Sequence, residues 1–305
     1  MGRSSDTEMR FAEMRFDDRV AIVTGAGRGL GRDHALLLAQ RGAKVVVNDV
    51  AADHAQQTAA DIIEAGGHAV ADIHSVVDGS EKIVETALES FGRLDIVVNN
   101  AGRGGPTGTL EQTTDAQVAT IISTHLVGTY SMCRAAWPHL RSQQYGRLLI
   151  TSSAAAVGSL GMPAYSMAKA GLIGLGRSLA LEGAPDNITV NILMPIGYTR
   201  SAALNPHEDT RRWMEENFPP HLCAPTAAFL VHEDVPCSGE ILTTGAGRAA
   251  LIATVGVPGW SGGQDLTMEG LRDHWSEVVN TKGFKPLRYS REELDFYTGP
   301  ATWRG

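Results

Sequence analysis

The stretch Thr24-Gly25-Ala26-Gly27-Arg28-Gly29-Leu30-Gly31 determines the fold that this sequence predicts. It joins an apolar, β-branched run to an amphipathic segment. Glycine is needed where a chain turns sharply close to a pyrophosphate, and a following helix offers free N–H groups to the phosphates. Leu30 replaces the last glycine of the common G-x-G-x-x-G, so the pattern is T-G-x-x-x-G-x-G; a tight turn without a ligand is the alternative. We expect a dinucleotide to be bound by Thr24, Gly25, Gly27, Arg28, Gly29, Leu30 and Gly31.

Short apolar stretches alternate with amphipathic ones over much of the chain. This alternation is typical of a parallel sheet covered by helices on both faces. It predicts an α/β fold, a doubly wound Rossmann-type sheet of about seven strands. Two long helices are expected, Asp115–Arg141 and Ala164–Glu182. The expected strands are Arg19–Thr24, Ala43–Asn48, His68–Asp72, Leu94–Asn99, Gly146–Ser152, Ile188–Met194 and Glu240–Thr244.

Three segments are expected along the chain. Residues 1–17 are polar and charged and are interpreted as a flexible N-terminal arm. Residues 18–245 form a single dinucleotide-binding catalytic domain, in which Ser201–Phe218 is expected to be a mobile helical segment. Residues 246–305 contain many glycines, prolines and aromatic residues but no second apolar core. We therefore expect a C-terminal extension that packs on the domain.

The composition restricts the class of partner. The formal net charge is −8, and no basic block could follow a phosphate backbone, so nucleic acid is not expected to bind. No apolar run approaches the roughly 18 residues that span a bilayer, so no membrane association is expected. The three cysteines, Cys133, Cys223 and Cys237, are far apart. They favour free thiols in a reducing, cytoplasmic setting, and they form no metal-ligand spacing.

Asp49 ends the second expected strand. A carboxylate there can accept hydrogen bonds from the adenosine ribose and repels a 2′-phosphate, which favours NAD. Arg28 is the opposing signal, because a guanidinium can hold a 2′-phosphate. We expect NAD to be preferred over NADP; a solvated carboxylate with no ligand is the alternative interpretation of Asp49.

Tyr165 and Lys169 lie four residues apart at the start of an expected helix, and so share one face of it. A neighbouring ammonium lowers the pKa of a phenol by favouring phenolate, which suits a group that exchanges a proton. Such a pair alone is often only a surface contact. Here it follows the strand that ends at Thr151-Ser152-Ser153, whose carboxyl end opens onto the expected ligand crevice. A serine hydroxyl there could hydrogen-bond the reacting oxygen.

Together these motifs resemble the short-chain dehydrogenase/reductase family. The chain also has Asn99-Asn100-Ala101-Gly102 after the fourth strand and Pro195-Ile196-Gly197-Tyr198-Thr199 after the sixth, as members of that family do. The resemblance implies hydride transfer between a secondary alcohol or ketone and a nicotinamide cofactor. It also implies a catalytic serine, Tyr165 and Lys169. The further cofactor contacts that it implies are Ser75, Val76, Asn100, Ala101, Gly102, Pro195, Ile196 and Thr199, with Tyr165 and Lys169.

Two positions depart from the family pattern. His125 stands where the family usually has a catalytic asparagine. It either takes over that role or is a structural histidine that kinks or caps the helix. The serine is ambiguous, because counting along the strand from Gly146 selects Ser153, whereas counting back from Tyr165 selects Ser152. We prefer Ser153, since a one-residue deletion belongs in the loop and not in the strand.

A narrower resemblance, over roughly residues 14–285, is to the (3R)-hydroxyacyl-CoA dehydrogenase units of peroxisomal multifunctional enzymes. It implies an acyl-CoA or a steroid alcohol as the small-molecule substrate. It also implies a homodimer or homotetramer formed through the two long helices, one of which is rich in small residues. A non-catalytic protein that senses NAD on the same fold is the rival hypothesis, as is a dehydratase or epimerase. The intact Tyr165 and Lys169 argue against the sensor.

Overall fold

A computed structural model describes residues 13–105, 108–199, 203 and 207–298. Residues 1–12 of the expected arm, residues 299–305 and part of the expected segment Ser201–Phe218 lie outside the described residues. The rest of that segment contains helix α8, Glu208–Asn217.

One eight-stranded sheet forms the centre of the protein, in the order β3-β2-β1-β4-β5-β6-β7-β8. The first seven strands in the chain are parallel, and only β8 pairs with its neighbour in the antiparallel direction. The doubly wound α/β fold is therefore confirmed, with one strand more than the sequence predicts. The strands are β1 Val20–Thr24, β2 Lys44–Asn48, β3 His68–Asp72, β4 Ile96–Asn99, β5 Gly146–Thr151, β6 Ile188–Pro195, β7 Ile241–Gly245 and β8 Arg248–Ile252.

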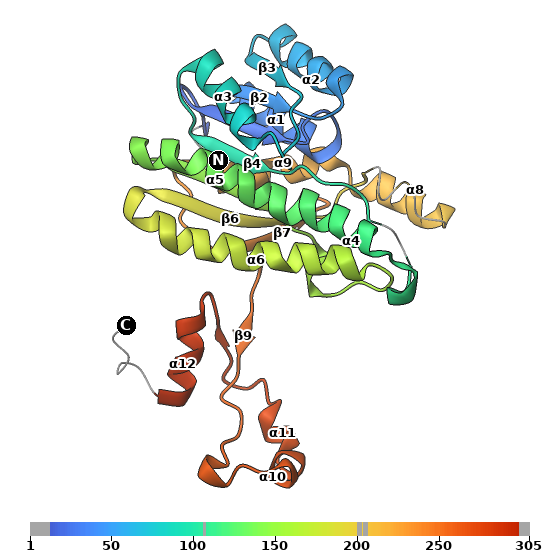
Figure 1. The fold of residues 1–305 in the computed structure, drawn as a ribbon, viewed down its shortest axis with the longest axis vertical. Helices are drawn as coiled ribbons and strands as arrows, with labels where there is room; N and C mark the ends of the chain where they lie inside the picture. Colours follow the sequence, from blue (N-terminus) through green and yellow to red (C-terminus); the bar gives the residue numbers. More distant parts are fainter. Residues whose placement is uncertain (1–12, 106–107, 200–202, 204–206, 299–305) are drawn as a thin grey trace, which may run out of the picture.

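Helices cover both faces of the sheet (Figure 1). Successive side chains of a strand point to opposite faces, so β1 sends Ala21 and Val23 into one apolar core and Val20 and Ile22 into the other. The first core includes residues of α1, α2 and α9, and the second includes residues of α3, α5 and α6. The helices are α1 Gly29–Gln40, α2 Ala52–Glu64, α3 Ser80–Phe91, α4 Asp115–Ile122, α5 Gly128–Gln143, α6 Pro163–Gly183 and α9 Ala224–Leu230.

The long helix expected over Asp115–Arg141 contains an irregularity. Between α4 and α5 the backbone forms a π-helix over Ser123–Val127. Such single wide turns occur inside α-helices and are frequent at functional sites. The turn brings the buried ring of His125 into the interior. Sequence periodicity alone did not predict it.

The C-terminal segment first adds a strand, β8, to the sheet and then leaves the domain. β8 lies beyond the expected domain end at residue 245 and pairs with β7 along its length. From β9 to α12 the chain lies away from the layered domain (Figure 1). Near its base, Arg177 of α6 binds the Thr254 hydroxyl at 3.2 Å, and Arg288 binds Glu240. Its elements are β9 Val255–Gly256, α10 Met268–Asp273, α11 Trp275–Val278, β10 Lys285–Pro286 and α12 Ser290–Thr298.

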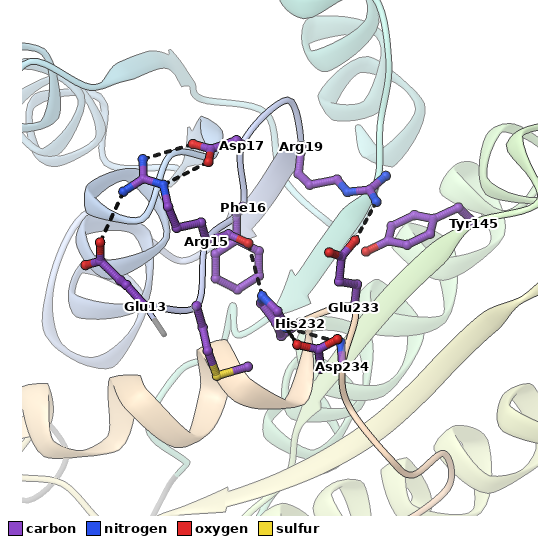
Figure 2. Close-up of a pocket in the computed structure, with 10 residues that line it drawn as sticks. Glu13, Arg15, Phe16, Asp17, Arg19, Tyr145, His232, Glu233 and Asp234 are labelled. Atoms are coloured by element: carbon purple, nitrogen blue, oxygen red, sulfur yellow. Dashed lines mark hydrogen bonds and ion pairs between the residues drawn. The ribbon is translucent and has the colours of Figure 1, made fainter. Parts of the chain in front are cut away.

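Residues 13–17 belong to the expected arm but are held on the domain. The Phe16 side chain is only 4% exposed, and its amide donates to the carbonyl of Arg41 at 2.7 Å. His232 hydrogen-bonds the Arg15 carbonyl through Nε2, and its ring meets Phe16 edge to face (Figure 2). The buried Phe16 side chain and these hydrogen bonds anchor residues 13–17 on the domain, and sequence composition does not reveal this.

Candidate active site

The glycine turn has the backbone conformation that its composition requires. Gly25 and Gly29 both have left-handed φ angles, +63° and +56°, which residues with a Cβ rarely adopt. A Cβ on Gly25 would lie 2.8 Å from the Cα of Ala101. The backbone of the turn therefore packs directly against the backbone that follows β4, with no side chain between them. α1 begins at Gly29, and no side chain caps its first turn. Its free N–H groups suit an anion.

Thr24 and Asn100 lock this turn to the end of β4. The Thr24 hydroxyl accepts hydrogen bonds from the amides of Asn100 and Ala101 at 3.1 and 2.9 Å. The Asn100 side chain donates to the carbonyls of Thr24 and Gly25 at 3.0 and 3.1 Å. These contacts give Asn100 and Ala101 a structural role in shaping the turn.

Asp49 lies directly beside the turn. Its carboxylate accepts from the amide of Gly27 at 3.1 Å and from that of Ala51 at 3.0 Å. A Cβ on Gly27 would stand 2.9 Å from the same carboxylate. Arg28 is exposed on the turn itself. The structure thus brings together the carboxylate expected to favour NAD and the guanidinium expected to oppose it.

The other expected cofactor contacts surround the same edge of the sheet. The Val76 side chain is buried against Gly128, and the Ser75 hydroxyl accepts from the amide of Val77 at 3.1 Å. Beyond β6, the Ile196 amide donates to the carbonyl of Thr244 at 2.7 Å. A Cβ on Gly197, next in the chain, would lie 3.2 Å from Leu30. Pro195 ends β6 and Thr199 follows it, so this loop lies over the glycine turn.

Ser153, and not Ser152, faces the phenol. Ser152 is buried, and its hydroxyl donates to the carbonyl of Lys169 at 2.8 Å. Ser153 is one residue further along, with its hydroxyl accepting from the amide of Ala155 at 3.2 Å. Burial raises the pKa of Tyr165, and a hydrogen bond with the Ser153 side chain opposes that rise. The two neighbouring serines, which directly follow β5, therefore face opposite sides.

Lys169 lies beneath Tyr165 on α6, one helical turn later. Its ammonium donates to the carbonyl of Thr151 at 2.7 Å and lies 5.6 Å from the centre of the Tyr165 ring. Burial lowers the pKa of Lys169 to about 7. The sequence predicts a Tyr165 pKa lowered by this ammonium, but in the chain alone that pKa is raised. The reason is that the phenol is itself buried and the ammonium is directed at a backbone carbonyl.

His125 meets Tyr165 from the π-helix. The two rings are perpendicular, with centroids 5.2 Å apart. His125 Nε2 lies 3.2 Å from the amide and 2.9 Å from the carbonyl of Arg103, while its buried Nδ1 has no hydrogen-bond partner. Burial, with the nearby charges of Lys169 and Arg103, lowers the pKa of His125 to about 3. The imidazole is therefore neutral, and it contacts both Tyr165 of α6 and the loop after β4.

Comparisons with known proteins agree with this geometry. The family model described as short chain dehydrogenase matches residues 19–212. The chain belongs to the short-chain dehydrogenase family. It is thus an oxidoreductase, and the residues gathered at the carboxyl edge of its sheet occupy the motif positions that the sequence predicts.

Its relatives include larger proteins. The chain is 40% identical over 290 residues to peroxisomal multifunctional enzyme type 2 of Drosophila melanogaster, covering 90% of this chain and 47% of that enzyme. The solved structure of that full-length enzyme superposes with a TM-score of 0.76 at 36% identity, over 92% of this chain and 49% of that one. The chain therefore spans about half the length of this relative.

Two solved structures are of comparable length to this dehydrogenase. A short chain dehydrogenase from Mycobacterium avium gives a TM-score of 0.73 at 30% identity, over 87% of this chain and 97% of that one. A 7α-hydroxysteroid dehydrogenase complexed with NADH and 7-oxo glycochenodeoxycholic acid gives 0.70 at 29% identity, over 76% and 95%. The shared fold and the family assignment imply a nicotinamide cofactor, and the glycine turn fits one because its bare backbone leaves room for phosphates.

Two features of the site were missed from the sequence. The Thr151 carbonyl binds Lys169, and the loop that begins at Arg103 lies against His125 and Tyr165, with a Cβ on Gly105 placed 3.5 Å from that of Tyr165. Every residue has a backbone carbonyl, so the sequence cannot show which carbonyl accepts a hydrogen bond from Lys169. Arg103 follows directly after Asn99–Gly102, and its adjacency to that motif was the available signal.

A pocket of about 370 Å³ lies elsewhere, between the N-terminal segment and the chain after α9 (Figure 2). Tyr145, which lines it, precedes β5, whereas Ser153 follows β5. The pocket is thus at the opposite, amino edge of the sheet. Its cations already have partners: Arg19 binds Glu233 at 3.0 Å, and Arg15 binds Asp17 at 2.8 Å. We interpret this pocket as the place where residues 13–17 pack on the domain, and not as the active site.

The described residues also bear on membrane-spanning helices, metal sites and the cysteines. Among the described residues, no helix is both long and apolar enough to cross a membrane. Within the same ranges, no group of three or more His, Cys, Asp or Glu side chains could hold a metal ion. The three cysteines are free thiols, and burial raises the pKa of Cys133 to about 12.

Proposed function

We propose that this short-chain dehydrogenase transfers a hydride between a 3-hydroxyacyl-CoA or a related secondary alcohol and NAD. The observation that carries the proposal is the group of Ser153, Tyr165 and Lys169, in which the Ser153 side chain lies beside the phenol and the ammonium is buried beneath it. The acyl-CoA is favoured by the similarity to peroxisomal multifunctional enzyme type 2 over most of this chain. A steroid alcohol is the second candidate, because a 7α-hydroxysteroid dehydrogenase shares the fold.

The three side chains divide the work on the substrate oxygen. Ser153 orients the hydroxyl and polarises the bond as charge develops on oxygen. Tyr165 takes the proton in oxidation and returns it in reduction. Lys169 is held beneath the phenol by its hydrogen bond to the Thr151 carbonyl, and the positive charge of a bound NAD⁺ would favour the phenolate of the buried Tyr165. A dinucleotide held by its phosphates at the glycine turn would supply the nicotinamide that accepts or delivers the hydride.

NAD is proposed over NADP because Asp49 presents its carboxylate at the turn. That carboxylate is close enough to accept from the amide of Gly27, and so would repel a phosphate on the adjacent ribose. Arg28 has the opposite effect, but it is exposed and more strongly screened by water.

We also propose a homodimer or homotetramer in a cytoplasmic setting. α6 presents exposed Met167 and Leu181, and a Cβ on its Gly174 would meet nothing within 4 Å, so a second helix could approach closely there. Tyr130 of α5 is also half exposed. The free thiols support a reducing compartment.

The proposal is tested by turnover with NAD⁺ and a panel of 3-hydroxyacyl-CoA and hydroxysteroid substrates. Tyr165→Phe removes the transferable proton but retains the ring, and should lower kcat by a factor on the order of 100 or more while NADH still binds. Oxidation should accelerate with rising pH and ketone reduction should slow, since one needs phenolate and the other phenol. A wild-type protein that binds NADH but oxidises no alcohol would favour the sensor hypothesis instead.

A further inference from the structure

Arg103 is the first residue after the turn that ends β4, and its backbone is fixed in place. Its amide and carbonyl lie 3.2 and 2.9 Å from Nε2 of His125, whose ring meets Tyr165 at 5.2 Å. Two residues further on, a Cβ on Gly105 would lie 3.5 Å from the Cβ of Tyr165. The loop is therefore held against the proton-transferring residue at two points.

The guanidinium of Arg103 is exposed and pairs with no carboxylate of the described chain. Many other arginines of the domain do so, as in the pairs Arg32–Asp61 and Arg93–Asp95. Burial and the charge of Lys169 lower the pKa of His125 most, and the charge of Arg103 adds to them. A planar, unpaired guanidinium is suited to bind a carboxylate or a phosphate.

The loops beside Tyr165 are otherwise markedly apolar at their tips. Leu110, Val157 and Leu160 are 77%, 80% and 102% exposed. Their two loops are joined by a hydrogen bond of 2.9 Å from the amide of Gly108 to the carbonyl of Gly161. A binding site with an apolar wall and one charged group discriminates ligands mainly through that group.

We propose that Arg103 binds an anionic group, a carboxylate or a phosphate, that the alcohol substrate carries, and so selects charged alcohols over neutral ones. This inference rests on the proposed function. The dinucleotide phosphates have their own site at Gly25–Gly31, where α1 begins with free N–H groups. Arg103 lies instead in the loop that contacts His125 and, through Gly105, Tyr165, and the reacting alcohol must lie next to the Tyr165 hydroxyl.

The test compares Arg103→Met with wild type on three matched thioesters. These are 3-hydroxybutyryl-N-acetylcysteamine, which is uncharged, 3-hydroxybutyryl-CoA, which carries phosphates, and 3-hydroxyglutaryl-N-acetylcysteamine, which carries a carboxylate near the alcohol. For at least one charged substrate, the KM relative to that of the uncharged thioester should rise about tenfold, equivalent to about 1.4 kcal/mol. The charged substrate affected identifies the anion as carboxylate or phosphate.

Two variants serve as controls. Arg103→Lys keeps the charge and should restore part of the discrimination. Arg134→Met removes an exposed guanidinium that pairs with Glu81 on the outer surface, and should leave all three KM values unchanged. In wild type, the KM of the affected substrate should rise with salt, and this dependence should weaken in Arg103→Met.

Each other outcome is decisive. If Arg103→Met changes all three KM values equally or not at all, the inference is refuted while the proposed function stands. If the variant loses NADH affinity without losing discrimination, Arg103 serves the dinucleotide and the inference is again refuted. If wild type oxidises none of the thioesters, the acyl-CoA proposal falls, and the inference falls with it.

Discussion

Ser152 and Ser153 provide a matched pair of substitutions in which the same change should damage different properties. The two serines have opposite environments: Ser152 donates to a carbonyl inside the fold, while the half-exposed Ser153 side chain lies beside the phenol of Tyr165. Ser152→Ala should therefore lower stability and spare the chemistry. Ser153→Ala should spare stability and slow the chemistry.

The expected magnitudes follow from the contacts. In Ser152→Ala one buried hydrogen bond of 2.8 Å is lost. Its acceptor, the Lys169 carbonyl, lies within α6 and keeps its helical hydrogen bond, so no group is left unpaired. The cost should be about 1 kcal/mol, or a fall in Tm of about 2–4 °C. In Ser153→Ala a donor to the developing charge on the substrate oxygen is lost, which typically lowers kcat about 100-fold.

Thermal unfolding and steady-state turnover, measured on both variants and wild type, separate the two effects. Ser153 is half-exposed, so in Ser153→Ala water can replace the hydroxyl as the acceptor for the Ala155 amide. The Tm of this variant should therefore differ little from that of wild type. The reasoning is refuted if Ser152→Ala loses activity as severely as Ser153→Ala while both remain folded. A large stability loss confined to Ser153→Ala would contradict it equally.

Three further predictions concern the cofactor, the buried ammonium and assembly. Asp49→Ala should shift the ratio of NADH to NADPH affinity toward NADPH by about tenfold; fluorescence titration measures this, and tighter NADPH binding by wild type would contradict the NAD assignment. Burial lowers the pKa of Lys169 to about 7, whereas the unfolded chain keeps it near 10.5. Charged Lys169 therefore destabilises the fold below pH 7, and this penalty disappears as the pH rises from 7 to 10.5. Lys169→Met should thus raise Tm most at pH 6, by an amount that shrinks toward pH 10; a gain independent of pH would exclude this cause. Light scattering at micromolar concentration should give a dimer or tetramer, and Leu181→Glu on α6 should weaken it; a monomeric wild type would refute the assembly proposal.

The sequence alone determined the sheet and the glycine turn, and it predicted the candidate pair of Tyr165 and Lys169. Glycines between an apolar strand and an amphipathic helix, and Tyr165 four residues before Lys169, are local patterns whose meaning depends on backbone geometry and helical periodicity. The same periodicity missed β8, because its residues are largely exposed on an edge strand and show no buried apolar run.

Only the tertiary structure decided which serine faces the phenol, how His125 sits and what Lys169 binds. Ser152 and Ser153 differ by one position, and only the packing of β5 against α6 determines which side each meets. His125 is held against Arg103, 22 residues earlier in the chain, and Lys169 binds the carbonyl of Thr151, 18 residues earlier. Burial then moved the pKa of Tyr165 up where its ammonium neighbour alone would have moved it down. Such effects depend on the surroundings of a side chain in three dimensions, which residue identity and spacing do not specify.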